Sequence, residues 1–253
     1  MRFASATASR VVFSVLAAAV LLLAPGAQAQ AGQGIFVTPI PGAPFVGEVS
    51  VQRTVIQPDG KSIVLYTRHL IARDADGRIR SDRTAFSTAN LTAAPAVINV
   101  HLYDPQNRFS TWLSPIRKTF WIVPLRHPPA TDAPGGYASP AGNVQPPSQF
   151  ANQQDLGTRT IAGEEVHGVR ETQKIPAAES GTGRDIVVTD EYWYSYDLKM
   201  NLSVTHTDPR TGSVTMTVTQ LNRTDPDPSL FAIPADYKPF GAPRPQAQKS
   251  NSQ

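Results

Sequence analysis

The sequence of 253 residues contains no cysteine. This absence excludes disulfide bonds and thiolate chemistry. It also excludes the lipid-modified N-terminus of a bacterial lipoprotein, which needs a cysteine at the cleavage point. Long apolar runs are equally scarce: the main one, Val11 to Ala24, is shorter than the ~20 residues that a membrane-spanning helix needs. We therefore expect no stable membrane span in the mature chain.

The start of the chain has the three parts of a cleavable secretory signal peptide. Two arginines form a positive n-region, Val11 to Ala24 is the apolar h-region, and Ala27-Gln28-Ala29 has the small-x-small pattern of a cleavage site. We expect residues 1–29 to be removed on export, which predicts a periplasmic or secreted location. Gln30 stands where a lipoprotein would carry cysteine, so the mature protein is not expected to be lipid-anchored.

The net charge is too small to indicate a nucleic-acid partner. The chain carries 23 Lys and Arg against 20 Asp and Glu, a formal charge of +3, and loss of Arg2 and Arg10 with the leader lowers it to +1. The remaining basic residues alternate with Asp, Glu, Thr and Ser instead of forming one basic stripe. We therefore expect no nucleic-acid partner.

Short runs rich in Val, Ile, Thr, Tyr and Trp, separated by turn-forming residues, indicate an antiparallel β protein. Pro58-Asp59-Gly60 is typical of these turns, since proline presets φ and glycine accepts a positive φ. One run places Val214, Met216 and Val218 on one face and threonines on the other, as in a strand with one buried face. The expected strands are 47–57, 62–73, 78–86, 97–103, 109–113, 119–125, 156–161, 166–174, 185–196, 198–207 and 213–221.

Two details refine this expectation. The polar run 78–86 is predicted to lie near an edge of the sheet. One helical turn is predicted where Asp227 can cap a helix that begins at Pro228, with Leu230 and Phe231 directed to the core.

We expect a single β-rich domain at residues 45–238, in which one curved antiparallel sheet is interrupted by a loop. Residues 126–150 are rich in proline and glycine, and proline lacks the donor of a sheet ladder, so this segment is predicted to be a long loop. Residues 30–44 are predicted to be a flexible N-terminal segment. Residues 239–253 have little apolar content and are predicted to be a disordered tail.

No enzyme motif emerges, and neither a metal nor another cofactor is expected. The five histidines are far apart in sequence, unlike the short spacings of zinc ligands, although His69, His101 and His206 lie in predicted strands and could converge. No G-x-S-x-G motif is present. The neighbouring acids Asp190 and Glu191 would point to opposite faces of a strand, so they cannot flank one glycosidic bond.

Aromatic residues form the most unusual pattern. Tyr192, Tyr194 and Tyr196 alternate along one predicted strand, and Trp112 and Trp121 belong to a second aromatic group with Phe109 and Phe120. Such residues either pack against the core or line a cavity for an apolar ligand or a sugar. We take Tyr192, Tyr194, Tyr196, Trp112 and Trp121 as the candidate ligand-binding wall.

Residues 155–238 carry a recognisable pattern. Its elements are Asp155-Leu156-Gly157, Ile161-x-Gly163, Val166-x-Gly168, Ile175-Pro176, Glu191-Tyr192-Trp193-Tyr194-Ser195, Asp208-Pro209-Arg210-x-Gly212 and Pro228-x-Leu230-Phe231-x-Ile233-Pro234-x-x-Tyr237. The pattern resembles a group of secreted bacterial β-rich proteins that are similar to periplasmic lipoprotein-carrier-like (LolA/RseB-type) domains. The resemblance implies a half-open antiparallel barrel whose cavity holds acyl chains or a lipoprotein. The long amphipathic helices that cover the cavity of such carriers are not found in this sequence.

These observations together predict a non-enzymatic, exported envelope protein that binds an apolar ligand or a lipidated partner in a concave β-sheet. The alternative is a β-rich protein-interaction module of the cell envelope without a ligand cavity, which meets its partner through sheet edges or loops.

Overall fold

The computed structural model describes residues 35–89, 93–125 and 151–240, which form a sheet of twelve strands and one 3₁₀ helix. The elements are β1 (Phe45–Ile56), β2 (Ser62–Arg73), β3 (Ile79–Thr84), β4 (Val97–Asp104), β5 (Phe109–Ser114), β6 (Thr119–Pro124), β7 (Ala151–Ile161), β8 (Glu164–Ile175), β9 (Ile186–Ser195), β10 (Met200–Asp208), β11 (Gly212–Asn222), η1 (Pro228–Phe231) and β12 (Lys238–Pro239).

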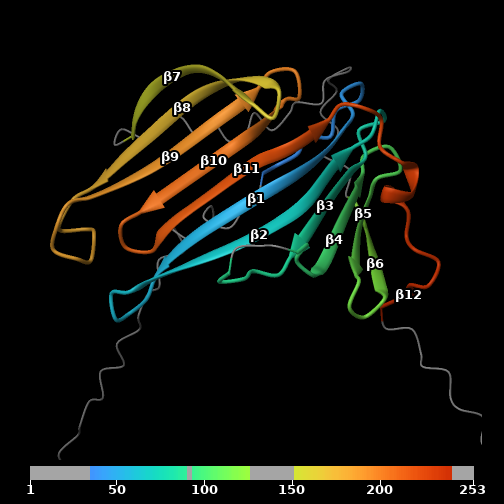
Figure 1. Ribbon diagram of the computed structural model, residues 1–253, viewed down its shortest axis with the longest axis horizontal. Helices are drawn as coiled ribbons and strands as arrows, with labels where there is room; N and C mark the ends of the chain where they lie inside the picture. Colours follow the sequence, from blue (N-terminus) through green and yellow to red (C-terminus); the bar gives the residue numbers. More distant parts are fainter. Residues whose placement is uncertain (1–34, 90–92, 126–150, 241–253) are drawn as a thin grey trace, which may run out of the picture. The chain divides into compact units, whose positions relative to one another are not determined.

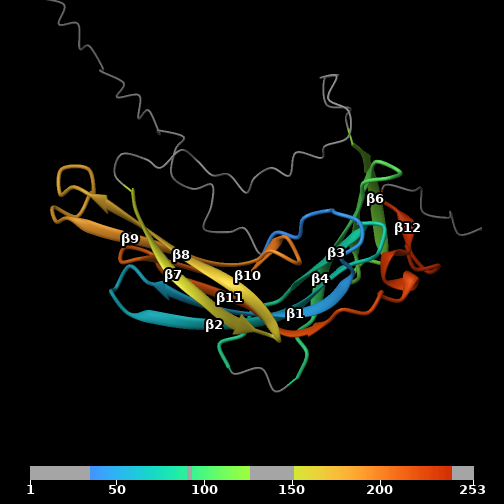
Figure 2. The same ribbon diagram turned by 90° about the horizontal axis from the view of Figure 1, so that it is seen from above.

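The strand order is β12-β6-β5-β4-β3-β2-β1-β11-β10-β9-β8-β7 (Figure 1). All neighbouring strands are antiparallel except β12, which pairs in parallel with β6. The sheet is curved and does not close, so it has two edges, at β7 and at β12 (Figure 2). The predicted fold class, a single curved antiparallel sheet in the form of a half-open barrel, is confirmed.

Two meanders, β1–β6 and β7–β11, meet at the ladder between β1 and β11. Short turns connect most sequence neighbours, while residues 85–96 join β3 to β4 and residues 176–185 join β8 to β9. Glycine is required where the chain comes close to itself. Gly212 has φ +110°, and a Cβ at this position would collide with the carbonyl oxygen of Thr54. Gly212 therefore allows β11 to begin directly beside the end of β1.

The main core lies on the concave face of the sheet. Side chains alternate along β1, so Phe45, Val49 and Val51 share one face and are buried. The register places Val49 opposite Val218 and Val51 opposite Met216 of β11, which are buried on the same face. The predicted alternation along β11 is thus the alternation between core and solvent.

Residues 35–44 lie on this concave face (Figure 2). Ile35 and Val37 are buried in the same cluster as the core residues of β1 and β11. The sequence predicts a flexible segment at 30–44, and residues 35–44 correct that prediction, because their two apolar side chains fill the hollow of the sheet. Residues 30–34 lie outside the described part of the chain.

Arg73, at the end of β2, fastens this covering segment to the sheet. Its side chain is fully buried, and its guanidinium donates hydrogen bonds to the carbonyl oxygens of Ala43 at 2.8 Å, Thr38 at 2.7 Å and Leu198 at 2.9 Å. The guanidinium also lies over the Phe45 ring, 5.2 Å from its centroid. One side chain thus joins residues 35–44, β2 and the β9–β10 turn.

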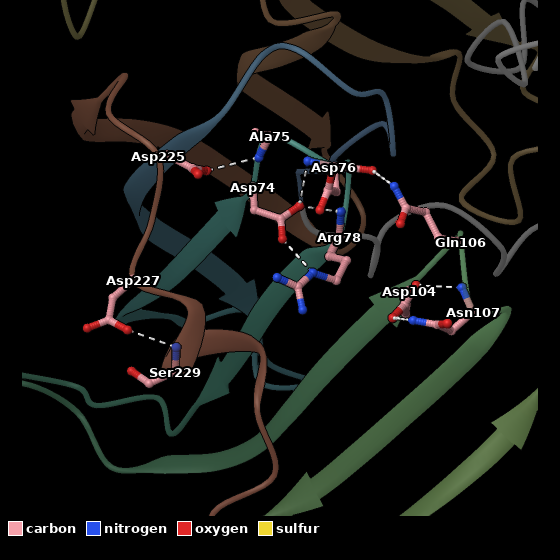
Figure 3. A network of polar contacts seen from close by, with 10 residues as sticks. All are labelled: Asp74, Ala75, Asp76, Arg78, Asp104, Gln106, Asn107, Asp225, Asp227 and Ser229. Atoms are coloured by element: carbon pink, nitrogen blue, oxygen red, sulfur yellow. Dashed lines mark hydrogen bonds and ion pairs between the residues drawn. The ribbon is translucent and has the colours of Figure 1, made fainter.

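The chain after β11 covers the other face of β4–β6. Val100, Leu102 and Leu113 point away from the concave face and pack with Ile233 and Tyr237. Asp227 caps η1 by accepting a hydrogen bond from the Ser229 amide at 2.8 Å, which confirms the predicted helical turn (Figure 3). Leu230 and Phe231 are, however, only half-buried.

Aspartates hold the turns at this end of the sheet (Figure 3). Asp225 accepts a hydrogen bond from the Ala75 amide at 3.0 Å, which joins the chain after β11 to the β2–β3 turn. Asp74 binds the Arg78 amide at 2.8 Å, and Asp104 binds the Asn107 amide at 2.8 Å. These carboxylates are therefore engaged in turn formation.

Two further predictions need correction, and others fall on residues outside the described part of the chain. The run 78–86 is predicted to lie near an edge, but β3 is interior, between β2 and β4, and its polar residues Arg80 and Asp82 pair with each other at 2.8 Å. Pro239, predicted to begin a disordered tail, belongs to β12. The leader 1–29, the loop 126–150 and residues 241–253 lie outside the described part of the chain. Within that part, no helix is long and apolar enough to cross a membrane.

Candidate functional site

A row of aromatic rings crosses the concave face on strands β4, β5 and β6. The ladder registers place His101 opposite Trp112 and Trp112 opposite Trp121. The same row continues inward through Ser81 to the buried Ile71. We call His101, Trp112 and Trp121 the aromatic row.

The rings of the aromatic row are nearly parallel. The centroids of His101 and Trp112 are 4.1 Å apart with an interplanar angle of 18°, and those of Trp112 and Trp121 are 6.0 Å apart at 10°. Phe240, which follows β12, meets Trp121 edge-on at 6.4 Å. These offset-stacked and edge-to-face arrangements are the favoured geometries of aromatic pairs.

His101 behaves as an apolar member of the row. Its Nε2 lies 2.6 Å from the Ser110 hydroxyl, and burial lowers the pKa of the imidazole below its ordinary value of 6.5. The ring is therefore neutral at pH 7, because burial disfavours its charged form. A neutral ring can stack on Trp112 without presenting a charge to an apolar ligand.

Exposure increases along the row from the core to the β6 side of the sheet. Ile71 is fully buried, His101 and Trp112 are half-buried, Trp121 is 40% exposed and Phe240 is 64% exposed. Within the described residues, the indole N–H groups of Trp112 and Trp121 have no hydrogen-bond acceptor. The row therefore offers a strip of accessible apolar surface with two free donors, continuous with the core.

The predicted tyrosines lie on the other arm of the sheet. Tyr192 shares the concave face, since the registers align it with Val204, Met216 and Val51. Burial first, and then the charges of nearby acids, raise the pKa of Tyr192 to about 12. The half-buried Tyr192 is thus held as a neutral phenol.

Tyr194 and Tyr196 form an edge-to-face pair at 5.2 Å, and Tyr196, in the β9–β10 turn, is 62% exposed. The structure therefore brings Trp112 together with Trp121, and Tyr194 together with Tyr196. It separates the two groups by the strands from β4 to β10.

Trp193, the third tryptophan, is a structural residue. It is 7% exposed, and its indole N–H donates to Glu191 at 2.7 Å. The Arg159 guanidinium lies over the ring, 3.6 Å from its centroid. A Cβ at Gly168 would stand 2.5 Å from the same ring, so glycine is needed there to admit the indole.

Two hollows lie away from the aromatic row. One, of about 310 Å³, is lined by residues that include Tyr103, Phe109, Ile122 and Phe231. The other, of about 600 Å³, includes Glu48 and Arg68, whose charged groups are 3.6 Å apart. None of the five predicted wall residues lines either hollow.

The histidines and paired acids do not converge on one centre. His206 Nδ1 lies 2.7 Å from Asp190, while Glu191 accepts from Arg170 at 2.9 Å. The two neighbouring acids thus have separate partners, as expected for opposite faces of β9. Within the described residues, no group of three His, Asp or Glu side chains is placed to hold a metal ion.

Comparison with known proteins gives structural likeness alone. No protein-family model matches the sequence, and no curated protein matches it. Among solved structures, MucB in its complex with MucA from Pseudomonas aeruginosa is similar, with a TM-score of 0.40 and 14% identity. The match covers 76% of this chain and 56% of the MucB chain, so this chain spans little more than half of that protein's length.

A LolA-superfamily protein from Nitrosomonas europaea has a TM-score of 0.31 and 9% identity, over 77% of this chain and 92% of that one. Lipoprotein LppX from Mycobacterium tuberculosis has a TM-score of 0.26 and 15% identity, over 73% and 90% of the two chains. The resemblance to lipoprotein-carrier-like domains noted from the sequence thus reappears among solved structures. Because these TM-scores are low, they assign no function to this chain.

Proposed function

We propose that this protein is a non-enzymatic envelope protein, exported by its leader, which binds an apolar ligand or a lipidated partner on the concave face of its sheet. The observation that carries this proposal is the aromatic row, an accessible apolar strip that runs from the β6 side of the sheet into the core. Apolar surface left accessible in a concave setting is typical of ligand sites.

The chemistry of the strip suits a chain-like apolar ligand with few polar groups. His101 is neutral at pH 7, so the row contributes no charge that such a ligand would have to desolvate. The indole N–H groups of Trp112 and Trp121 could donate to an ester carbonyl while the rings contact an alkyl chain. Tyr192, Tyr194 and Tyr196 would form the second wall on the other arm.

The three tryptophans provide a test without an added label. The protein is purified from the compartment to which an expressing cell exports it, and mass spectrometry reads its N-terminus and any bound lipid. A brominated fatty acid is then titrated, since bromine quenches a nearby indole. We expect quenching of Trp112 and Trp121, and none of the buried Trp193.

Variants separate these signals. In W112F/W121F only Trp193 still fluoresces, and we expect this variant to show no quenching. Phe86→Ser is the matched control, because the exposed fraction of Phe86, 47%, is similar to the 40% of Trp121, and Phe86 lies outside the row. Equal quenching of W112F/W121F and the unmodified protein would contradict the proposal, as would a protein that neither carries lipid nor responds to the brominated acid.

The alternative, an interaction module without a ligand cavity, is favoured by one observation. Strand β7 pairs with β8 on one side and forms an edge of the sheet, with side chains that are mostly exposed. An extended peptide can add to such an edge through main-chain hydrogen bonds. A proline at Thr158 would weaken partner capture under this alternative and would leave fatty-acid quenching unchanged.

A further inference from the structure

The turn between β5 and β6 combines an exposed apolar side chain with basic ones. Pro115, Ile116, Arg117 and Lys118 form this turn, and Ile116 is 72% exposed, the highest value among the exposed large hydrophobic side chains of the described residues. Arg117 and Lys118 are exposed beside it. An isoleucine in water at the tip of a hairpin has no role in the core.

A third cation adjoins the turn. Lys238 of β12 pairs with Thr119, and its amide donates to the Lys118 carbonyl at 2.9 Å. Among the described residues, the carboxylate that pairs with these cations is that of Asp236, which binds Lys118 Nζ at 2.8 Å. We call Ile116, Arg117, Lys118 and Lys238 the tip surface; its cations outnumber its neighbouring acid.

We propose that the tip surface docks on an anionic lipid bilayer, with Ile116 inserted among the headgroups and the cations on lipid phosphates. Basic residues near a membrane gain from the negative surface potential, and an isoleucine gains by leaving water. The electrostatic attraction and the burial of the isoleucine act at the same place, because the cations flank the apolar tip.

The shape of the tip favours a bilayer over a folded protein partner. A stable protein interface buries about 800 Å² per partner over a broad, complementary patch. One turn and the end of a two-residue strand offer a narrow protrusion, which a fluid headgroup layer can surround and a rigid surface cannot. Four residues therefore suffice for the bilayer.

The inference does not depend on the proposed ligand site, although the two adjoin. The turn leads directly into β6, so docking would bring the exposed end of the aromatic row near the lipid. The two are tested separately, because Ile116 and Arg117 are outside the row. Their variants should keep the quenching response to the brominated fatty acid.

The test is co-sedimentation of the purified protein with sucrose-loaded vesicles. Vesicles of phosphatidylglycerol mixed with phosphatidylcholine are compared with vesicles of phosphatidylcholine alone. We expect binding to the first, weakened by added salt, and little binding to the second. Ile116→Ser and Arg117→Glu should each lower the partition coefficient about tenfold, as loss of one buried apolar side chain or reversal of one charge predicts.

Matched controls lie at the other end of the strands. Leu198, in the β9–β10 turn, accepts a hydrogen bond from Arg73, and the registers align Arg73 with Ser110 near the start of β5. The β5–β6 turn follows Ser114 at the opposite end of β5. Lys199→Glu makes the same charge reversal there, and Phe36→Ser removes an exposed apolar side chain of similar exposure. Both controls should bind the anionic vesicles like the unmodified protein.

Several outcomes would overturn the inference. They are no binding to phosphatidylglycerol vesicles, tip variants that bind like the unmodified protein, or controls that lose as much binding as the tip variants. Loss with Arg117→Glu but not with Ile116→Ser would also overturn it, because that result indicates attraction to any acidic surface without insertion. Circular dichroism and an unchanged urea midpoint confirm that each variant is folded.

Discussion

Replacing Arg73 with methionine tests how residues 35–44 are held on the sheet. Arg73 is fully buried and has carbonyl oxygens, not a carboxylate, as its hydrogen-bond partners: Thr38, Ala43 and Leu198. Three bonds from a charged donor contribute about 1.5–3 kcal/mol each. Removal of the guanidinium deprives the buried oxygens of Ala43 and Leu198 of this donor, whereas the Thr38 oxygen still accepts a hydrogen bond from the Ile40 amide at 3.0 Å.

The cost of burying the Arg73 charge offsets part of the stabilisation that the three hydrogen bonds provide. Burial first, and then the charge of Arg223, lowers the pKa of Arg73 from its ordinary 12.5 to about 10, so the buried charge costs roughly 3 kcal/mol and the group remains protonated at pH 7. Methionine avoids that cost. We therefore expect R73M to lower the free energy of unfolding by about 2–5 kcal/mol, the net of three lost bonds and one relieved charge.

Urea unfolding, followed by tryptophan fluorescence and by far-ultraviolet circular dichroism, measures this difference. The matched control is R78M at the same end of the sheet, where Arg78 is partly exposed and paired with Asp74. Asp74 is buried, but without the Arg78 guanidinium it keeps the hydrogen bonds from the amides of Asp76 and Arg78, so R78M should lower the free energy of unfolding by less, about 1–2 kcal/mol. If R73M and R78M unfold at the same urea concentration, Arg73 does not fasten the segment as we infer. R73K, which keeps the charge without the three-way geometry, should lie between R73M and the unmodified protein.

The remaining predictions concern titration and packing. Burial lowers the pKa of His69 and of His101, so their contribution to stability is complete above pH 6.5 and is lost as the pH falls toward their folded-state values. The urea midpoint should therefore decrease when the pH is lowered from 7 to 5, and H101Q should make this decrease smaller. An equal decrease in H101Q and in the unmodified protein would argue against a buried, neutral His101. Gly168→Ala should lower the free energy of unfolding by about 1–3 kcal/mol, because its Cβ would stand 2.5–2.8 Å from three ring atoms of Trp193. A near-ultraviolet dichroism signal and urea midpoint equal to those of the unmodified protein would show that the ring moves freely away.

Local sequence signals predict the strands and turns well, because they act over a few residues. The run 62–73 coincides with β2, and the capped turn at Asp227 is present. The interior place of β3 could not be predicted, since its polar composition suggested an edge. Arg80 and Asp82 are tolerated inside the sheet because they neutralise each other, and that pairing is a property of the fold.

The sequence predicts only part of the aromatic row. The turn predicted after Tyr103 joins β4 to β5 as a hairpin, and its register places His101 on Trp112. The sequence predicts one aromatic group for Trp112 and Trp121 but does not place His101 in it, because the exact register depends on turn geometry. Phe240 was assigned to a disordered tail, and its contact with Trp121 depends on a parallel pairing that no local pattern signals.

The separation of the two aromatic groups follows from strand order. The local sequence does not indicate that β1 lies beside β11. Because these two strands are neighbours, six strands lie between Trp112 on β5 and the tyrosines of β9. Side-chain alternation predicts which face a residue takes, but it does not predict how far apart two strands lie across a sheet. Arg73 was missed for a similar reason, since its partners come from three separate stretches of chain.

The ladder between β1 and β11 has a consequence for how the chain acquires its structure. Within each meander, every strand can pair with its sequence neighbour as soon as both exist. The seam between the meanders joins Val46 to Asn222, near opposite ends of the described chain. Closing so large a loop has a high entropic cost, so the seam should form late. A chain that crosses a membrane as an unfolded thread, N-terminus first, would carry β1 with one edge open until β11 emerges. During that interval the edge can pair with another molecule, which makes assistance from a chaperone most valuable before the seam closes.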